Sequence, residues 1–227
     1  MQKISAVFNN NRIYFGGLLA ILVAAILFLI LNGKEAAFLS PDTYHPFYLN
    51  VFFINYTFMG DGFFALCLVA SMIWYFKKRK PGFALLYSFL ISGLAVQLIK
   101  NLVNLSAPKL YFEAGTYLNF INSVTLDGHS GFPSGHTATA FAIATVLALM
   151  MKNRKLQLLI LMAAALVGYS RIYLAQHFLT DVIVGALSGT ASGILSFYLV
   201  QNRITVKGSM KNIYQSPSSS PGVIQTA

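Results

Sequence analysis

Long apolar stretches recur along this chain of 227 residues, separated by shorter polar or basic segments. A helix that crosses a membrane needs about 20 mostly apolar residues. We therefore predict six membrane-spanning helices, at residues 13–31, 52–76, 83–103, 137–151, 156–173 and 178–200. Gly60-Asp61-Gly62 interrupts the second, and a long irregular segment separates the third from the fourth. The pattern predicts an all-α, polytopic membrane domain over residues 1–200, followed by a polar tail at 201–227 that we expect to be disordered.

The composition agrees with a membrane protein. Hydrophobic residues make up 56% of the chain and charged residues only 10%, which is too apolar for an ordinary soluble domain. The single cysteine, Cys67, excludes an intramolecular disulfide and a cysteine-based metal site. The first apolar stretch follows Lys3 and Arg12 and is longer than the core of a signal peptide, so we interpret it as a membrane anchor.

The basic residues indicate which way the chain is inserted. If the segments between the predicted helices alternate across the membrane, one side receives twelve of them: Lys3, Arg12, Lys77, Lys78, Arg79, Lys80, Lys152, Arg154, Lys155, Arg203, Lys207 and Lys211. The other side receives the remaining four and all six acids: Lys34, Lys100, Lys109, Arg171, Glu35, Asp42, Asp61, Glu113, Asp127 and Asp181. The positive-inside rule then predicts that both termini are cytoplasmic and that the second side faces outward. The net charge of +10 thus reflects topology and attraction to anionic membrane lipids, not nucleic-acid binding.

The most concentrated candidate chemistry lies between the last two apolar stretches. His177 and Asp181 are four residues apart, so on a helix they would share one face. A carboxylate behind an imidazole fixes its tautomer and raises its basicity, as a nucleophile or base requires. The guanidinium of Arg171 suits a phosphate. Each of these residues alone could be structural at a membrane edge, but the three together favour a functional site.

A second candidate element is Pro133-Ser134-Gly135-His136, at the start of the fourth predicted helix. Ser134 is a plausible helix cap, and Gly135 would let a ligand approach the backbone amides, whose partial positive charge favours anions. His136, in the first turn, is placed to donate a proton to a leaving group. A purely structural cap with an interfacial histidine is the alternative for this element alone. Lys100 and Lys109 are predicted to lie on the same outer face.

With these elements the chain resembles the type 2 phosphatidic acid phosphatase family of integral membrane lipid phosphatases. The family pattern has three blocks: a lysine, six residues and Arg-Pro; then Pro-Ser-Gly-His; then Ser-Arg, five residues, His, three residues and Asp. The second block is complete at 133–136, and the third is complete at Ser170, Arg171, His177 and Asp181. The first has its lysine, Lys100, but Ala107-Pro108 occupies the Arg-Pro position.

The resemblance implies a mechanism. His177 would attack phosphorus, oriented by Asp181, and His136 would protonate the departing oxygen. It also implies that four residues hold the phosphate, without a metal or another cofactor: Lys100, Arg171, Ser134 and Gly135. Because Ala107 lacks a phosphate-binding side chain, we hypothesise that Lys109 partly substitutes for the family's arginine; a solvated loop lysine is the alternative. For Asp61 we favour a structural cap or pair over a substrate contact.

The expected function is hydrolysis of a lipid phosphate at the outer, periplasmic face of a bacterial inner membrane. Undecaprenyl diphosphate, phosphatidylglycerol phosphate, phosphatidic acid and lipid A phosphates all remain candidate substrates. Two alternatives stay open: a phosphotransferase that passes the phosphate to another lipid, and a catalytically impaired lipid-phosphate binder, suggested by Ala107. A self-contained monomer is our expectation, with a dimer also compatible with the sequence.

Overall fold

A computed structural model describes residues 4–39, 45–103, 105, 108 and 131–214, with side chains described only for residues 7–201 of these. Its elements are all helical: α1 (Ile4–Asn10), α2 (Arg12–Leu39), α3 (Phe47–Tyr56), η2 (Thr57–Gly60), α4 (Gly62–Ala70), η3 (Ser71–Tyr75), α5 (Arg79–Val103), α7 (Gly135–Met150), α8 (Arg154–Tyr173) and α9 (Leu179–Tyr214). The prediction of an all-α fold is confirmed for this part of the chain.

Length and apolarity qualify four helices to cross a membrane: α2, α5, α8 and the segment Leu179–Gln201 of α9. The pair Phe47–Gly60 and Gly62–Tyr75 passes the same test together, with a bend of 58° at the break, so it is either a broken span or a re-entrant loop. Helix α7, with 16 residues, is apolar but shorter. The described residues therefore contain four or five helical spans by this measure, and the count of six stays a prediction.

The bend falls at the predicted interruption, Gly60-Asp61-Gly62. Asp61 has an extended backbone and caps α4, because its Oδ1 accepts a hydrogen bond from the Phe63 amide at 2.7 Å. Gly60 brings η2 against the start of α7: a Cβ there would lie 2.7 Å from the His136 carbonyl oxygen. The sequence thus breaks the helix at the point where it must approach α7 closely.

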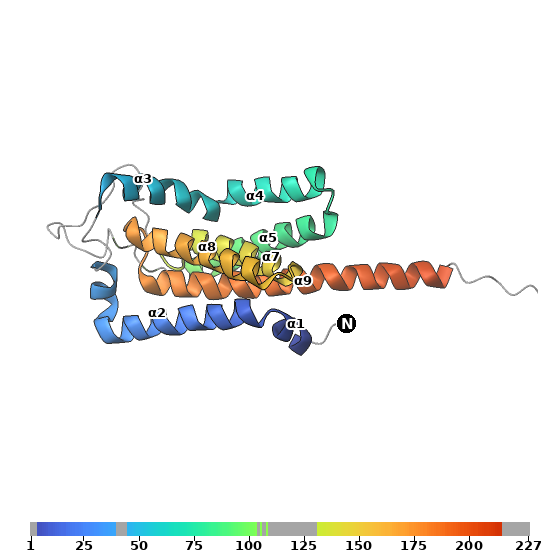
Figure 1. The fold of residues 1–227 in the computed structure, drawn as a ribbon, viewed down its shortest axis with the longest axis horizontal. Helices are drawn as coiled ribbons and strands as arrows, with labels where there is room; N and C mark the ends of the chain where they lie inside the picture. The colour runs from blue at the N-terminus through green and yellow to red at the C-terminus, as the bar shows by residue number, and fades with distance from the viewer. Residues whose placement is uncertain (1–3, 40–44, 104, 106–107, 109–130, 215–227) are drawn as a thin grey trace, which may run out of the picture.

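Helix α7 is the centre of the bundle. It packs against α5, α8 and α9, while α3 and α4 run along one side of this group and α2 along the other (Figure 1). Most of its side chains are buried, as expected for a helix that is apolar on all faces. One polar contact ties it to α2, where the Tyr14 hydroxyl lies 2.9 Å from Thr145 Oγ1.

Small residues let α9 approach α7 closely. A Cβ at Gly185 would lie 2.7 Å from the Ser134 carbonyl oxygen, and one at Gly189 would overlap the Ala138 carbonyl oxygen. Glycines at helical spacing thus allow the two backbones to pack closely at these positions. As a result, the start of α9 is held beside the start of α7.

Helix α9 continues to Tyr214, well past residue 200. The first part of the region predicted to be a disordered tail is therefore helical, and residues 215–227 lie outside the described residues. The division into a membrane domain and a tail at residue 200 stays a prediction.

Candidate active site

His177 and Asp181 contact each other in a buried turn. His177 Nδ1 lies 3.4 Å from Asp181 Oδ2, and both side chains are buried. Asp181 is itself held in place, since its Oδ2 accepts from the Phe178 amide at 2.9 Å and its Oδ1 from the Thr180 hydroxyl at 3.0 Å. A carboxylate at Nδ1 favours the tautomer that carries its proton there. The lone pair then lies on Nε2, the atom that could act as a nucleophile.

The local backbone differs from the prediction that the two residues share a helical face. Helix α9 begins at Leu179, so only Asp181 is on it, while His177 belongs to the turn after α8. In that turn the amides of Gln176 and His177 both donate to the Arg171 carbonyl oxygen, at 3.0 and 3.2 Å. The turn therefore folds His177 back between Arg171 and Asp181, and a four-residue spacing achieves the contact without a continuous helix.

Burial lowers the pKa of His177 below its ordinary value of 6.5. The hydrogen bond to Asp181 and its negative charge oppose this effect, while the positive charges of Arg171 and Lys100 add to it. The imidazole is consequently neutral at neutral pH, as a nucleophilic nitrogen must be.

Ser134 caps α7, as predicted. Its Oγ accepts hydrogen bonds from the Thr137 amide at 3.4 Å and from the Thr137 hydroxyl at 2.9 Å. Its backbone amide donates to the Asp181 carbonyl oxygen at 3.1 Å, which joins two of the three sequence blocks directly. Around Gly135 a Cβ would meet only the Val96 side chain, at 3.9 Å. The backbone at the start of α7 is therefore approachable.

His136 faces a carboxylate. Its Nε2 lies 3.8 Å from Asp61 Oδ2, with 32% of the His136 side chain and 43% of the Asp61 side chain exposed. Burial, together with the positive charge of Arg171 and smaller effects of His177 and Lys100, lowers the pKa of His136 to about 4, while the Asp61 carboxylate opposes this shift. The two predicted histidines and two of the predicted phosphate-binding cations thus belong to one electrostatic environment.

Arg171 is buried and only partly satisfied. Its Nη1 donates to Thr57 Oγ1 at 2.8 Å, which anchors the guanidinium to η2. Its Nε is buried and has no hydrogen-bond partner among the described atoms. An unmet, charged donor in a buried position is suited to an anionic oxygen supplied by a ligand. Lys100 lies in the last turn of α5 and completes the positive charge around His177.

Sequence reasoning missed Thr57 and did not identify the partner of Asp61. Thr57 lies in an apolar stretch with no local signal, and only the contact with Arg171 reveals it. Asp61 was predicted as a cap or pair, and the structure shows both: Oδ1 caps α4 and Oδ2 faces His136. The sequence signal for a role of Asp61 was the presence of an acidic residue within an apolar stretch. Lys109 and Ala107 lie outside the described residues, so the substitution by Lys109 stays a prediction.

In the described part of the chain, no three His, Cys, Asp or Glu side chains are grouped in a way that could hold a metal ion. The described residues of the site offer the two histidines, their carboxylates and the surrounding cations. Such a set can bind a phosphate, attack phosphorus and protonate an oxygen.

Residues 81–205, more than half of the chain, match the model of the PAP2 superfamily. The chain belongs to this superfamily, which confirms the resemblance drawn from the sequence blocks. It is 32% identical to the lipid A 4'-phosphatase of Bacteroides thetaiotaomicron over 99 residues, covering 44% of this chain and 43% of that protein. It is 31% identical to the undecaprenyl-diphosphatase BcrC of Bacillus subtilis over 136 residues, covering 59% of this chain and 66% of that protein.

A solved structure has the same architecture. The crystal structure of Aquifex aeolicus LpxE superposes with a TM-score of 0.61 at 33% identity, covering 71% of this chain and 92% of that one. The chain spans less than two thirds of the length of the two curated relatives named above.

Proposed function

We propose that this chain is an integral membrane phosphatase that hydrolyses a phosphate or diphosphate headgroup of a lipid through a phosphohistidine intermediate. One observation carries the proposal: a neutral, buried His177 is backed by Asp181 and lies in the same electrostatic environment as His136 and the buried cation Arg171. The family membership and the names of the relatives, which are phosphatases of lipid A and undecaprenyl diphosphate, support it.

In the first step, Nε2 of His177 attacks phosphorus. A nitrogen–phosphorus bond forms, the bond from phosphorus to the leaving oxygen breaks, and His136 transfers its proton to that oxygen. Asp181 stabilises the imidazolium character that develops on His177. In the second step, His136 takes a proton from water, the water oxygen attacks phosphorus, and the nitrogen–phosphorus bond breaks to release phosphate.

His136 must carry a proton when the substrate is bound. We propose that Asp61 favours this protonated form, because its carboxylate lies 3.8 Å from Nε2. The negative charge of the substrate adds to the same effect. Asp61 is then a positioning residue that acts through His136 and need not touch the substrate.

The non-bridging oxygens would be bound by Nε of Arg171, which has no partner among the described atoms, and by the amide of Gly135. The positive charge of Lys100 would add to the attraction. Ser134 Oγ already accepts two hydrogen bonds, so its own hydroxyl hydrogen is free to donate to the phosphate. We propose that Lys109 adds a further cation in place of the arginine absent at Ala107.

For the membrane arrangement, we propose six spans over residues 1–200, counting α7 and the bent pair as one span each. Large apolar side chains exposed on the outer face of α2, such as Leu19, Ile30 and Leu31, support lipid contact. The distribution of basic residues supports insertion in a bacterial inner membrane with cytoplasmic termini and a periplasmic site. The lipid tail of the substrate would stay in the bilayer while its headgroup enters the site.

The test is phosphate release by the purified protein in detergent micelles, from undecaprenyl diphosphate, phosphatidylglycerol phosphate, phosphatidic acid and a lipid A phosphate. Wild type should release phosphate from at least one of them, and His177→Ala should abolish release. His45→Ala is the matched control, because it removes an imidazole that packs against the Tyr173 ring outside the proposed reaction path. It should keep most of the activity.

Two other results would replace the proposal. Appearance of phosphate on an acceptor lipid instead of in water would indicate a phosphotransferase. Binding of lipid phosphates without turnover by wild type would indicate a non-catalytic binder.

A further inference from the structure

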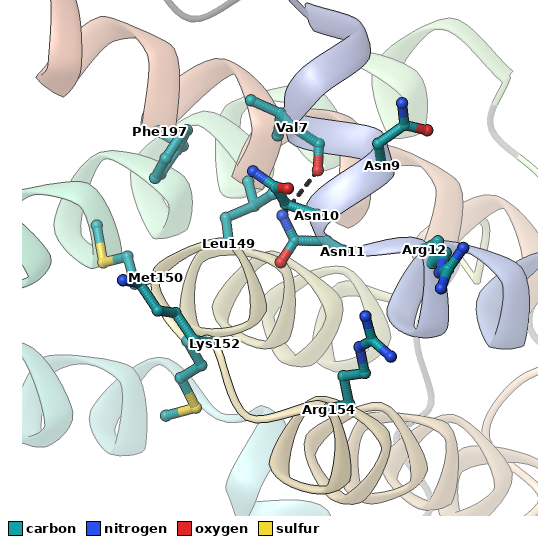
Figure 2. A pocket seen from close by; sticks show the side chains of 11 residues that line it. Val7, Asn9, Asn10, Asn11, Arg12, Leu149, Met150, Lys152, Arg154 and Phe197 are labelled. Atoms are coloured by element: carbon teal, nitrogen blue, oxygen red, sulfur yellow. Dashed lines mark hydrogen bonds between the residues drawn. The ribbon is translucent and has the colours of Figure 1, made fainter.

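A polar cavity lies at the end of the bundle opposite the candidate active site. Its volume is about 430 Å³, and it lies between the junction of α1 with α2 and the junction of α7 with α8 (Figure 2). Helix α7 starts at Gly135 beside the candidate site and ends at Met150 in this cavity, so roughly 24 Å separates the two, at 1.5 Å per residue.

The cavity concentrates positive charge. Arg12, Lys152 and Arg154 line it, and no ion pair joins any of them to a carboxylate in the described part of the chain. The carboxylates that the structure describes are Glu35, Asp61 and Asp181, at or near the opposite ends of their helices. Three cations around one cavity repel one another unless an anion offsets them.

The wall of this cavity is built from a buried polar network. Asn11, only 5% exposed, lines the cavity, and its Nδ2 donates to the Val7 carbonyl oxygen at 2.8 Å (Figure 2). Behind it, the fully buried Gln157 donates from Nε2 to Asn11 Oδ1 at 2.7 Å and to the Met151 carbonyl oxygen at 2.8 Å. These bonds lock the turn before α2 to the turn before α8, and so hold Arg12 and Arg154 on the same cavity.

The remaining lining combines amide donors with an apolar side. Asn9 and Asn10 come from α1, while Leu149, Met150 and Phe197 provide apolar surface, with Phe197 across the cavity from Arg12 and Arg154 in Figure 2. Guanidinium groups bind phosphate oxygens in a fork, and basic pockets between membrane helices suit anionic headgroups.

We propose that this cavity binds a phosphate group at the membrane face opposite the catalytic site, separately from catalysis. The phosphate would come from an anionic lipid headgroup or from soluble phosphate, since both present the same oxygens to Arg12, Lys152 and Arg154. The adjacent apolar side chains would give a lipid an additional contact that free phosphate lacks.

The test compares two triple variants of the full chain. Arg12→Gln/Lys152→Gln/Arg154→Gln removes three charges from the cavity, and Lys77→Gln/Lys78→Gln/Arg79→Gln removes three charges from the same end of the bundle outside it. Native mass spectrometry measures binding of dihexanoyl phosphatidylglycerol, with dihexanoyl phosphatidylcholine as the neutral headgroup. A thermal shift titration measures inorganic phosphate. Any phosphate bound at the candidate active site contributes equally to both variants.

We expect the cavity variant to bind phosphatidylglycerol at least about tenfold more weakly than wild type, and the control to stay within about twofold, because only the former removes direct charged hydrogen bonds. If the cavity variant loses affinity for phosphatidylglycerol alone, the cavity is a lipid headgroup site. If it loses affinity for inorganic phosphate to the same extent, the cavity binds a soluble ligand. Equal weakening by both triple variants, or by neither, would overturn the proposal in favour of diffuse surface charge. If the triple variant does not fold, Arg154→Gln alone tests the proposal, because this side chain is exposed. It should weaken phosphatidylglycerol binding about threefold, and unchanged binding would contradict the proposal.

Discussion

The carboxylate of Asp61 lies 3.8 Å from Nε2 of His136, although 75 positions separate the two residues in the sequence. The contact exists because Gly60 lets η2 lie against the start of α7 and because Asp61 breaks the helix immediately afterwards. The same carboxylate caps α4 with its other oxygen. The bend in the α3–α4 pair therefore delivers a negative charge to the proposed proton donor.

Asp61→Asn should lower kcat roughly three- to tenfold with little change in KM. Asparagine caps a helix about as well as aspartate, so the substitution removes the charge and keeps the bend. The loss is modest because the pair is partly exposed to solvent. Steady-state phosphate release measures it, and Asp61→Glu should restore part of the rate. An unchanged kcat in a correctly folded Asp61→Asn protein would remove this residue from the mechanism.

Asp181→Asn should lower kcat by roughly a hundredfold to a thousandfold. An amide cannot stabilise the cationic imidazole as a carboxylate does, and it can favour the wrong tautomer of His177. The variant also loses acceptor strength toward Phe178 and Thr180, so a fall in melting temperature should accompany the loss of rate. Thr180→Ala is the control, since it removes one hydrogen bond to Asp181 and leaves the carboxylate against His177. It should retain most of the activity.

The lowered pKa of His177 predicts how rate and stability depend on pH. The neutral imidazole is the nucleophile, so the acid limb of kcat/KM should lie below pH 6.5. For stability, the unfolded chain binds a proton at this residue near pH 6.5, while the folded chain binds it only at lower pH. The unfolded state therefore holds more protons in this window, and the free energy of unfolding should fall as the pH drops below 6.5.

Thermal melts of wild type and His177→Gln measure this contribution. They should cover about pH 4 to 8, a range that brackets the ordinary pKa of histidine. Glutamine cannot titrate, so part of the acid-side loss of stability should disappear in the variant. Identical pH profiles of melting temperature would contradict a buried, neutral His177.

Local spacing was enough to predict the contacts within each sequence block. Ser134 caps α7 and His177 meets Asp181, because a cap and a four-residue spacing are short-range features. The glycines of α9 lie at a helical spacing that favours close packing of membrane helices, but only the structure identifies α7 as the partner.

Contacts between distant segments were not predictable. The hydrogen bond from Arg171 to Thr57 joins residues 114 apart, and the sequence around Thr57 is apolar with no signal of its own. Asp61 was visible as an acid in an apolar stretch, but its partner depends on how η2 packs on α7. The span predicted at 178–200 agrees with the apolar segment Leu179–Gln201, whereas the helix continues to Tyr214 because polarity ends a membrane span without ending a helix.

Gly189→Ala should disturb the site from a distance, through the separation of α7 and α9. A Cβ at this position would overlap the Ala138 carbonyl oxygen, which is backbone and cannot rotate away. The two helices must then move apart, at a cost of about 1–3 kcal/mol in the free energy of unfolding. That movement also stretches the hydrogen bond from the Ser134 amide to the Asp181 carbonyl oxygen, so kcat should fall together with the melting temperature.

Gly93→Ala is the matched control, because a Cβ there meets nothing within 4 Å and alanine favours the helix of α5. It should leave the rate unchanged and keep or raise the melting temperature, whereas an equal effect of the two substitutions would show that the α7–α9 contact does not set the geometry of the site.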